Sequence, residues 1–191
     1  SNLLDYMESV VPDSLNESED YQIWQGNSNP FLGIYNHPSS SFYEQAASGA
    51  LAPKYTDLTG MEAQLPAKHR KNSKWYFDRT TFGVVRGMTA SGSGVPIFQA
   101  GVGGKQDTIL GYPFEIVGDG IQNSTSVTAS GTKYFSLGDL GTCWIGRNNN
   151  ELELQVDNMT QMNERIVNFF WTRFEGIGLA NAKAMVTYKI K

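Results

Sequence analysis

The chain has 191 residues, of which 40% are hydrophobic and 12% aromatic, so it can bury a core and is not a disordered segment. Charged residues make up only 18%, and the formal net charge of −4 excludes a general nucleic-acid footprint. A single cysteine excludes an internal disulfide, and no apolar run approaches membrane-spanning length. We therefore expect a soluble, folded protein of a reducing compartment.

Two helices are expected in the first third of the chain. The first covers about residues 3–24, and Pro12 inside it should kink the helix or restart it. The second runs from about Thr56 to Gln64, with Thr56 or Asp57 as its N-cap. A turn-rich connection joins the two helices.

The rest of the chain alternates between short strands and glycine-rich loops. Residues 74–78 form a strand candidate and residues 79–88 a helix, followed by a loop over 89–106 with one brief extended piece. Further extended segments are expected near 113–117, 133–137, 142–146 and 151–158, and then two strands joined by a turn around 176–181. This order predicts an α+β fold with a mainly antiparallel sheet.

The glycine-rich stretch GVGGKQ at 101–106 fails as a phosphate-binding loop. Such a loop needs a glycine where Gln99 stands and a hydroxyl residue where Gln106 stands. No nucleotide or other cofactor is therefore expected.

Catalytic and metal-binding residues are equally sparse. His37 and His69 are the only histidines, and no nearby cysteine or carboxylate cluster completes a metal site. Cys143 could pair with a histidine as a nucleophile, but a lone cysteine is more often a small buried hydrophobe. No catalytic, metal-binding or small-molecule site is expected, so the chain is predicted not to be an enzyme.

The stretch LPAKHRKNSKWYFDR at 65–79 allows two interpretations. Basic residues beside aromatic ones are typical of a nucleic-acid surface. The alternative is a helix end and a turn leading into a buried strand. Because Trp75 and Phe77 share one face of that strand, they are expected to be core residues that cannot stack on bases.

Charge is distributed unevenly along the chain. Residues 1–20 carry six acidic side chains and no lysine or arginine, whereas residues 66–86 carry six basic side chains and one acidic one. Solvated faces would explain this separation. The alternative is that it steers identical subunits head to tail.

LPAKHRKNSKWYFDRTTFGVVRG at 65–87 combines a helix, a basic run, a short strand and another helix. Four further stretches stand out along the chain: SEDYQIWQGNSNPFLGI at 18–34, PIFQAGVGGKQDTILGYPFEI at 96–116, KYFSLGDLGTCWIGRNNNELELQ at 133–155 and NFFWTRFEGIGLANAKAMVTYKI at 168–190. In their order along the chain, the five stretches resemble the major capsid proteins of tailed bacteriophages with the HK97 fold.

The resemblance implies an α+β, HK97-like fold with an axial lobe and a partial peripheral lobe. Residues 1–45 would supply the spine helix and connection of the peripheral lobe, and 46–160 the axial lobe. Residues 161–178 would form the long peripheral strand, and 179–191 a strand returning to the axial lobe. The N-terminal arm and extended E-loop of the family have no counterpart here, so we expect that these residues alone cannot build a shell.

The implied function is that of a structural head protein in the virion capsid, made in the bacterial cytoplasm. Copies of the chain would assemble into pentamers and hexamers around double-stranded DNA, held without sequence readout, and no membrane is involved. The candidate subunit-interface residues are Asp13, Glu17, Glu19, Lys68, Arg70, Lys71 and Arg173. The alternatives are an encapsulin-like compartment shell protein and a small host α+β binding domain.

Overall fold

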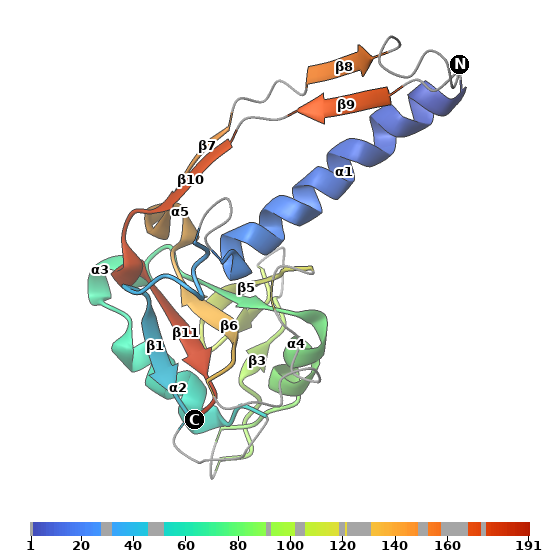
Figure 1. Cartoon of the computed structure of the whole chain (residues 1–191). Helices are drawn as coiled ribbons and strands as arrows, with labels where there is room; N and C mark the ends of the chain where they lie inside the picture. Colours follow the sequence, from blue (N-terminus) through green and yellow to red (C-terminus); the bar gives the residue numbers. More distant parts are fainter. Residues whose placement is uncertain are drawn as a thin grey trace.

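The computed structural model describes residues 2–27, 32–45, 52–90, 93–101, 106–118, 121, 131–148, 153–157, 168–172 and 175–191. The described residues form a compact body and an arm that extends away from it (Figure 1). The arm contains the long helix α1, Asn2–Gln25, and four strands from the later part of the chain. The N-terminus lies at the far end of the arm, and the C-terminus lies at the opposite end of the body.

The elements after α1 are short and follow one another closely. In chain order they are β1 Ser41–Glu44, α2 Tyr55–Gln64, α3 Ala67–Arg70, β2 Lys74–Phe77, α4 Arg79–Arg86, β3 Phe98–Gln99, β4 Thr108–Ile109, β5 Tyr112–Ile116, β6 Lys133–Gly138, α5 Leu140–Cys143, β7 Trp144–Asn148, β8 Glu153–Asp157, β9 Asn168–Thr172, β10 Glu175–Leu179, the 3-10 turn η2 Ala182–Ala184 and β11 Met185–Lys189.

A mixed sheet of seven strands forms the centre of the body, in the order β1-β11-β6-β2-β5-β4-β3. The pairs β1–β11 and β2–β5 are parallel, and the other four pairs are antiparallel. The predicted α+β class is thus confirmed, and the sheet is mainly, but not wholly, antiparallel.

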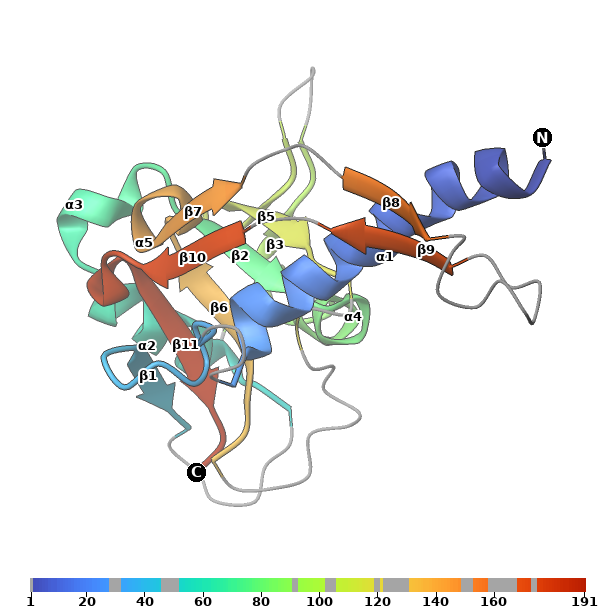
Figure 2. The same cartoon turned by 45° about the horizontal axis from the view of Figure 1, so that its top comes forward.

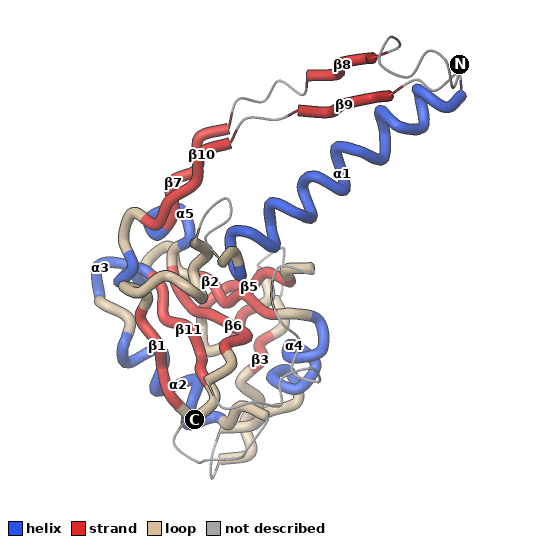
Figure 3. Tube along the Cα trace, viewed as in Figure 1, coloured by secondary structure: helices blue, strands red, loops and turns tan. Residues whose placement is uncertain are grey.

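The strands of the arm pair with one another rather than with the central sheet. β7 pairs with β10 and β8 with β9, giving two antiparallel ribbons that follow each other along the arm (Figure 3). Strand pairing also places β1 in the body, although residues 41–44 fall in the segment assigned from sequence to the peripheral lobe. Similarly, β7 and β8 lie in the arm, although residues 144–157 fall in the segment assigned to the axial lobe.

Both faces of the central sheet are covered by apolar side chains. On one face, Trp75 and Phe77 of β2 pack with Phe135 of β6 and with α2, and all three aromatic side chains are fully buried. On the other face, Tyr76 packs against Trp24 from the last turn of α1, with 5.3 Å between ring centroids. Burying each large apolar side chain contributes roughly 1.5–3 kcal/mol, so β2 is held from both sides.

The turn after α1 fixes the root of the arm to the body. Ile34 and Tyr35 donate backbone hydrogen bonds to the carbonyls of Ile23 and Trp24 at 2.8 and 2.9 Å, so the end of α1 is closed by the returning chain. The remainder of α1 extends away from the sheet, as the view in Figure 2 also makes clear.

The structure corrects two details of the expected helices. α1 continues through Pro12, so the helix does not restart there, and the alternative of a kink at Pro12 stays a prediction. The N-cap of α2 is Lys54 rather than Thr56 or Asp57. Asp57 instead accepts a hydrogen bond from the Lys54 backbone N–H at 2.8 Å, which is the role of the third residue in a capping box.

The extended segment expected near 142–146 begins instead with the single helical turn α5. Asp139 explains the difference, because its carboxylate accepts hydrogen bonds from the Thr142 backbone N–H and hydroxyl at 3.3 and 2.7 Å. An N-cap of this kind satisfies the free N–H groups of a first helical turn, so the strand starts only at Trp144.

Candidate subunit-interface surfaces

The basic segment before β2 is a short helix and a turn, as the packing interpretation of 65–79 predicts. Trp75 is fully buried, and its indole N–H donates to the carbonyl of Ile109 at 3.0 Å. The ring of Phe77 stacks on it with 5.6 Å between centroids. Neither aromatic side chain is available to stack on a nucleic-acid base.

The three basic candidates of this segment have different surroundings. The Arg70 guanidinium donates from Nε to the carbonyl of Leu65 at 3.1 Å and from Nη2 to the carbonyl of Glu62 at 3.0 Å. It therefore satisfies the carbonyl groups at the C-terminal end of α2. Lys68 and Lys71, by contrast, are exposed on α3 and the following turn.

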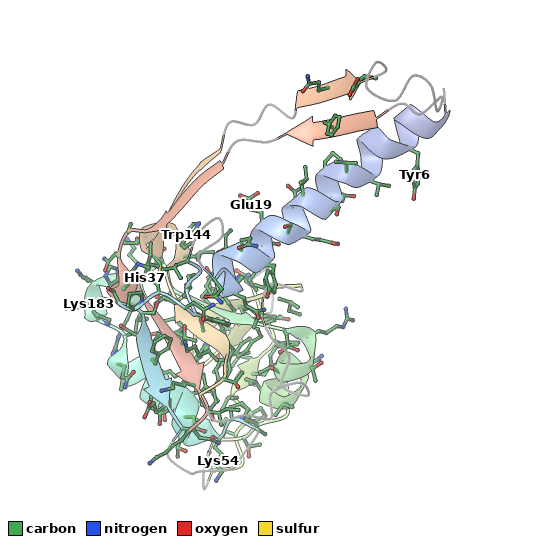
Figure 4. The ribbon with its side chains drawn as sticks, viewed as in Figure 1. Tyr6, Glu19, His37, Lys54, Trp144 and Lys183 are labelled. Atoms are coloured by element: carbon green, nitrogen blue, oxygen red, sulfur yellow. The ribbon has the colours of Figure 1, made fainter. Side chains whose placement is uncertain are left out.

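Lys183 is a fourth cation beside this segment, and it was not identified from the sequence. His69 is buried, and its ring Nε2 lies 3.4 Å from the side-chain amide of Asn181, which joins α3 to the turn before β11. Lys183 follows in that turn, is exposed, and lies beside α3 (Figure 4). The 112 positions between His69 and Asn181 leave no local signal for this contact.

The acidic candidates lie on α1. Asp13 and Glu17 are exposed, whereas Glu19 is half-buried. The remaining candidate, Arg173, lies outside the described residues. The structure therefore brings Lys68 and Lys71 together on one surface and Asp13 and Glu17 together on another.

The carboxylate of Asp20 lies where α1 meets the sheet. Burial raises the pKa of Asp20, and the negative charge of Glu115 on β5 raises it further. Glu115 itself forms an exposed ion pair with Lys74 at 3.3 Å. The junction between the arm and the body thus holds two carboxylates that repel each other.

Cys143 is fully buried, and burial, with a smaller contribution from Asp139, raises the pKa of its thiol to about 12. The thiol is therefore protonated at neutral pH and is not a nucleophile. This agrees with the interpretation of a lone cysteine as a buried hydrophobe. Among the described residues, no three His, Cys, Asp or Glu side chains gather to hold a metal ion.

A pocket of about 320 Å³ lies between the last turn of α1 and the start of β6, and Lys133 is the cation in its lining. The Lys133 ammonium donates to the carbonyl of Tyr35 and lies 4.6 Å from the centre of the Phe42 ring. Burial lowers its pKa, and the nearby Lys189 lowers it further. Lys133 therefore has structural partners and no acid or nucleophile beside it in this lining.

No helix in the described part of the chain combines the length and apolar character needed to cross a bilayer.

Comparison with known protein families places the chain in a class of structural proteins. Residues 1–190 match the phage capsid family, and the chain belongs to that family. It is accordingly a structural protein and not an enzyme. A comparison with curated protein sequences gave no significant match.

Solved structures with the same fold include capsids and an encapsulin complex. The capsid of a native GTA particle matches with a TM-score of 0.80 at 16% identity, over 99% of this chain and 72% of that chain. The capsid of an empty GTA particle matches with a TM-score of 0.79 at 16% identity, over 99% and 66% of the two chains. An encapsulin complex from Synechococcus elongatus matches with a TM-score of 0.67 at 14% identity, over 98% and 65%.

These matches confirm the HK97-like fold that the resemblance implied. At such low identities they establish the fold alone. The chain spans about two thirds of the length of the capsid of the empty GTA particle.

Proposed function

We propose that the chain is the shell-forming part of a major capsid protein in the head of a tailed phage or prophage. Copies would assemble into pentamers and hexamers that enclose double-stranded DNA. The observation that carries this proposal is the match of residues 1–190 to the phage capsid family. A body with an extended arm supports this proposal, because such a shape would offer separate surfaces to several neighbouring copies.

The strand pairing supports a revised division into lobes. The peripheral lobe would consist of α1 and the ribbons β7–β10 and β8–β9, and the axial lobe would consist of the seven-stranded sheet with its helices. In this division, β1 and the returning strand β11 belong together in the axial lobe, because they pair directly.

The DNA inside the shell would be held weakly and without sequence readout. A net charge of −4 disfavours a general attraction to phosphate groups, and Trp75 and Phe77 are buried in the core. Packaging would therefore depend on enclosure by the shell rather than on affinity for a DNA sequence.

Sedimentation velocity of the full-length protein tests this proposal. We expect particles or rings far larger than a monomer, together with a monomer pool that grows on dilution. A species that remains monomeric at every concentration, in the presence of the remaining head proteins, would argue against a capsid role.

An encapsulin-like shell is the second candidate, favoured by the similarity to the encapsulin complex at a TM-score of 0.67. The two functions differ in what the particle encloses. Particles purified from the native host and treated with nuclease before opening would release DNA in the first case and a protein cargo in the second.

A further inference from the structure

The side of α1 that faces solvent carries a continuous stripe of exposed residues. Positions three or four apart lie on one face of a helix, and five exposed residues follow that spacing. They are Tyr6, Val10, Asp13, Glu17 and Tyr21. We call this set the α1 stripe.

The α1 stripe mixes large apolar side chains with acidic ones. Tyr6, Val10 and Tyr21 are 63%, 42% and 46% exposed. The carboxylates of Asp13 and Glu17 make no ion pair with a described residue. Tyr6 points from α1 to the side opposite β9 (Figure 4).

A complementary surface lies on the body. Lys68, Lys71 and Lys183 are exposed and are held together by the contact between His69 and Asn181. We call these three lysines the lysine edge. None of their ammonium groups pairs with a carboxylate in the described part of the chain.

The two surfaces cannot meet within one molecule, because α1 extends away from α3 toward the far end of the arm (Figure 1). We infer that the α1 stripe of one copy binds the lysine edge of the next copy. This inference rests on the proposed capsid function. A contact between two different surfaces of identical subunits is heterologous, and it generates a ring when the rotation closes.

The spacing of the charges suits this contact. Asp13 and Glu17 lie one helical turn apart, about 6 Å along the axis, and Lys68 and Lys71 lie three positions apart on a helical turn. The tyrosines that flank the acidic pair would exclude water from it and so strengthen the attraction.

The refined surface differs from the set inferred from sequence. Arg70 is excluded because its guanidinium is bonded to the carbonyls of Leu65 and Glu62. Glu19 is excluded because it is half-buried, and Lys183 is added. The lysine edge needs a partner with regularly spaced carboxylates. The chain itself provides them in residues 1–20, which contain no lysine or arginine.

Charge reversal and rescue in the full-length protein test the contact. We expect Lys68→Glu with Lys71→Glu, and separately Asp13→Lys with Glu17→Lys, to raise the subunit concentration needed for rings by about tenfold or more, because like charges would then face each other. Mixing the two double variants should restore rings of six, in which the two variants can alternate so that each contact is complementary, but not rings of five. Lys183→Glu should act in the same direction, with a smaller effect.

Lys54→Glu is the matched control for Lys183→Glu, because Lys54 is exposed at the opposite end of the body (Figure 4) and each substitution replaces one positive charge with one negative charge. Circular dichroism spectra of every variant should match the wild type. Rings that form normally in both double variants would overturn the inference while leaving the capsid function intact. Loss of DNA binding with unchanged ring formation in the lysine variants would also overturn it and would assign the lysine edge to DNA.

A wild-type protein that forms no rings would contradict the capsid function itself. The wild-type measurement therefore separates the two failures.

Discussion

At the scale of single residues, side chains that look alike in sequence have different roles in this fold. Arg70 and Lys71 are adjacent cations, yet Arg70 holds the end of α2 and Lys71 is exposed. Arginine suits the first role because its planar guanidinium can donate to two carbonyl groups at once. The sequence gives the charge of both residues but not the carbonyl groups to which Arg70 donates.

Arg70→Ala should lower the free energy of unfolding by roughly 1–2 kcal/mol, because two charge-assisted hydrogen bonds to the end of α2 are lost. Lys71→Ala, at an exposed position, should change it by less than about 0.5 kcal/mol. Urea denaturation of both variants measures the difference. Equal effects of the two substitutions would contradict the capping role of Arg70.

Asp20 gives a prediction that depends on pH. Burial and Glu115 raise the pKa of Asp20 in the folded protein, so its charged form destabilises the fold above that pKa. Asp20→Asn should therefore stabilise the protein at pH 7. This gain should shrink as the pH falls through the raised pKa toward the ordinary value of 3.8, since the wild-type carboxyl then becomes neutral as well.

Thermal unfolding of Asp20→Asn at pH 7 and pH 3.5 measures this effect. Asp13→Asn, about two turns nearer the N-terminus of the same helix, is the control. A gain for Asp20→Asn that is the same at both pH values would show that charge is not the cause.

At the scale of elements, the position of α1 depends on its last turn and on the chain that returns across it. Gly33 is the tightest point of this junction. A Cβ atom at that position would lie 2.6 Å from the Gly26 nitrogen and 2.7 Å from the Gln22 carbonyl oxygen. Both are backbone atoms, so the clash could be relieved only by moving the chain that closes α1.

Gly33→Ala should therefore destabilise the protein by about 2 kcal/mol or more and loosen α1. Gly83→Ala is the matched control, because a Cβ atom in the middle of α4 meets nothing within 4 Å. It should stabilise the protein by about 0.5–1 kcal/mol through the better helix propensity of alanine. Hydrogen exchange along α1 would report the loosening, and unchanged protection in Gly33→Ala would contradict this account.

At the scale of the whole molecule, local patterns predicted many of the elements, and long-range contacts determined their arrangement. The alternation of Trp75 and Phe77 predicted a strand with a buried face, and Asp78 caps the helix that follows it. The four-residue strand β1, in contrast, pairs in parallel with β11, which lies about 145 positions later. No hairpin turn or hydrophobic period marks a pairing of that kind, so local sequence patterns do not reveal it.

For the candidate surfaces too, local sequence features were predictable and long-range contacts were not. Charge counts along the chain identified an acidic segment and a basic one, and Lys68 and Lys71 are indeed exposed. Lys183 was missed because only the contact between His69 and Asn181 brings it to α3. Whether Arg70 was exposed could not be read from composition, because its acceptors lie on the preceding helix.

Electron microscopy of particles assembled from the full-length protein tests the central claim most directly. The claim is that this subunit, with its body and its extended arm, forms the wall of a closed shell. We predict rings of five and six subunits into which the structure fits, with each α1 lying against the α3 side of a neighbouring copy. A map that accommodates the seven-stranded body but leaves α1 without any neighbouring subunit, or a protein that forms no shell with its native head components, would contradict the account.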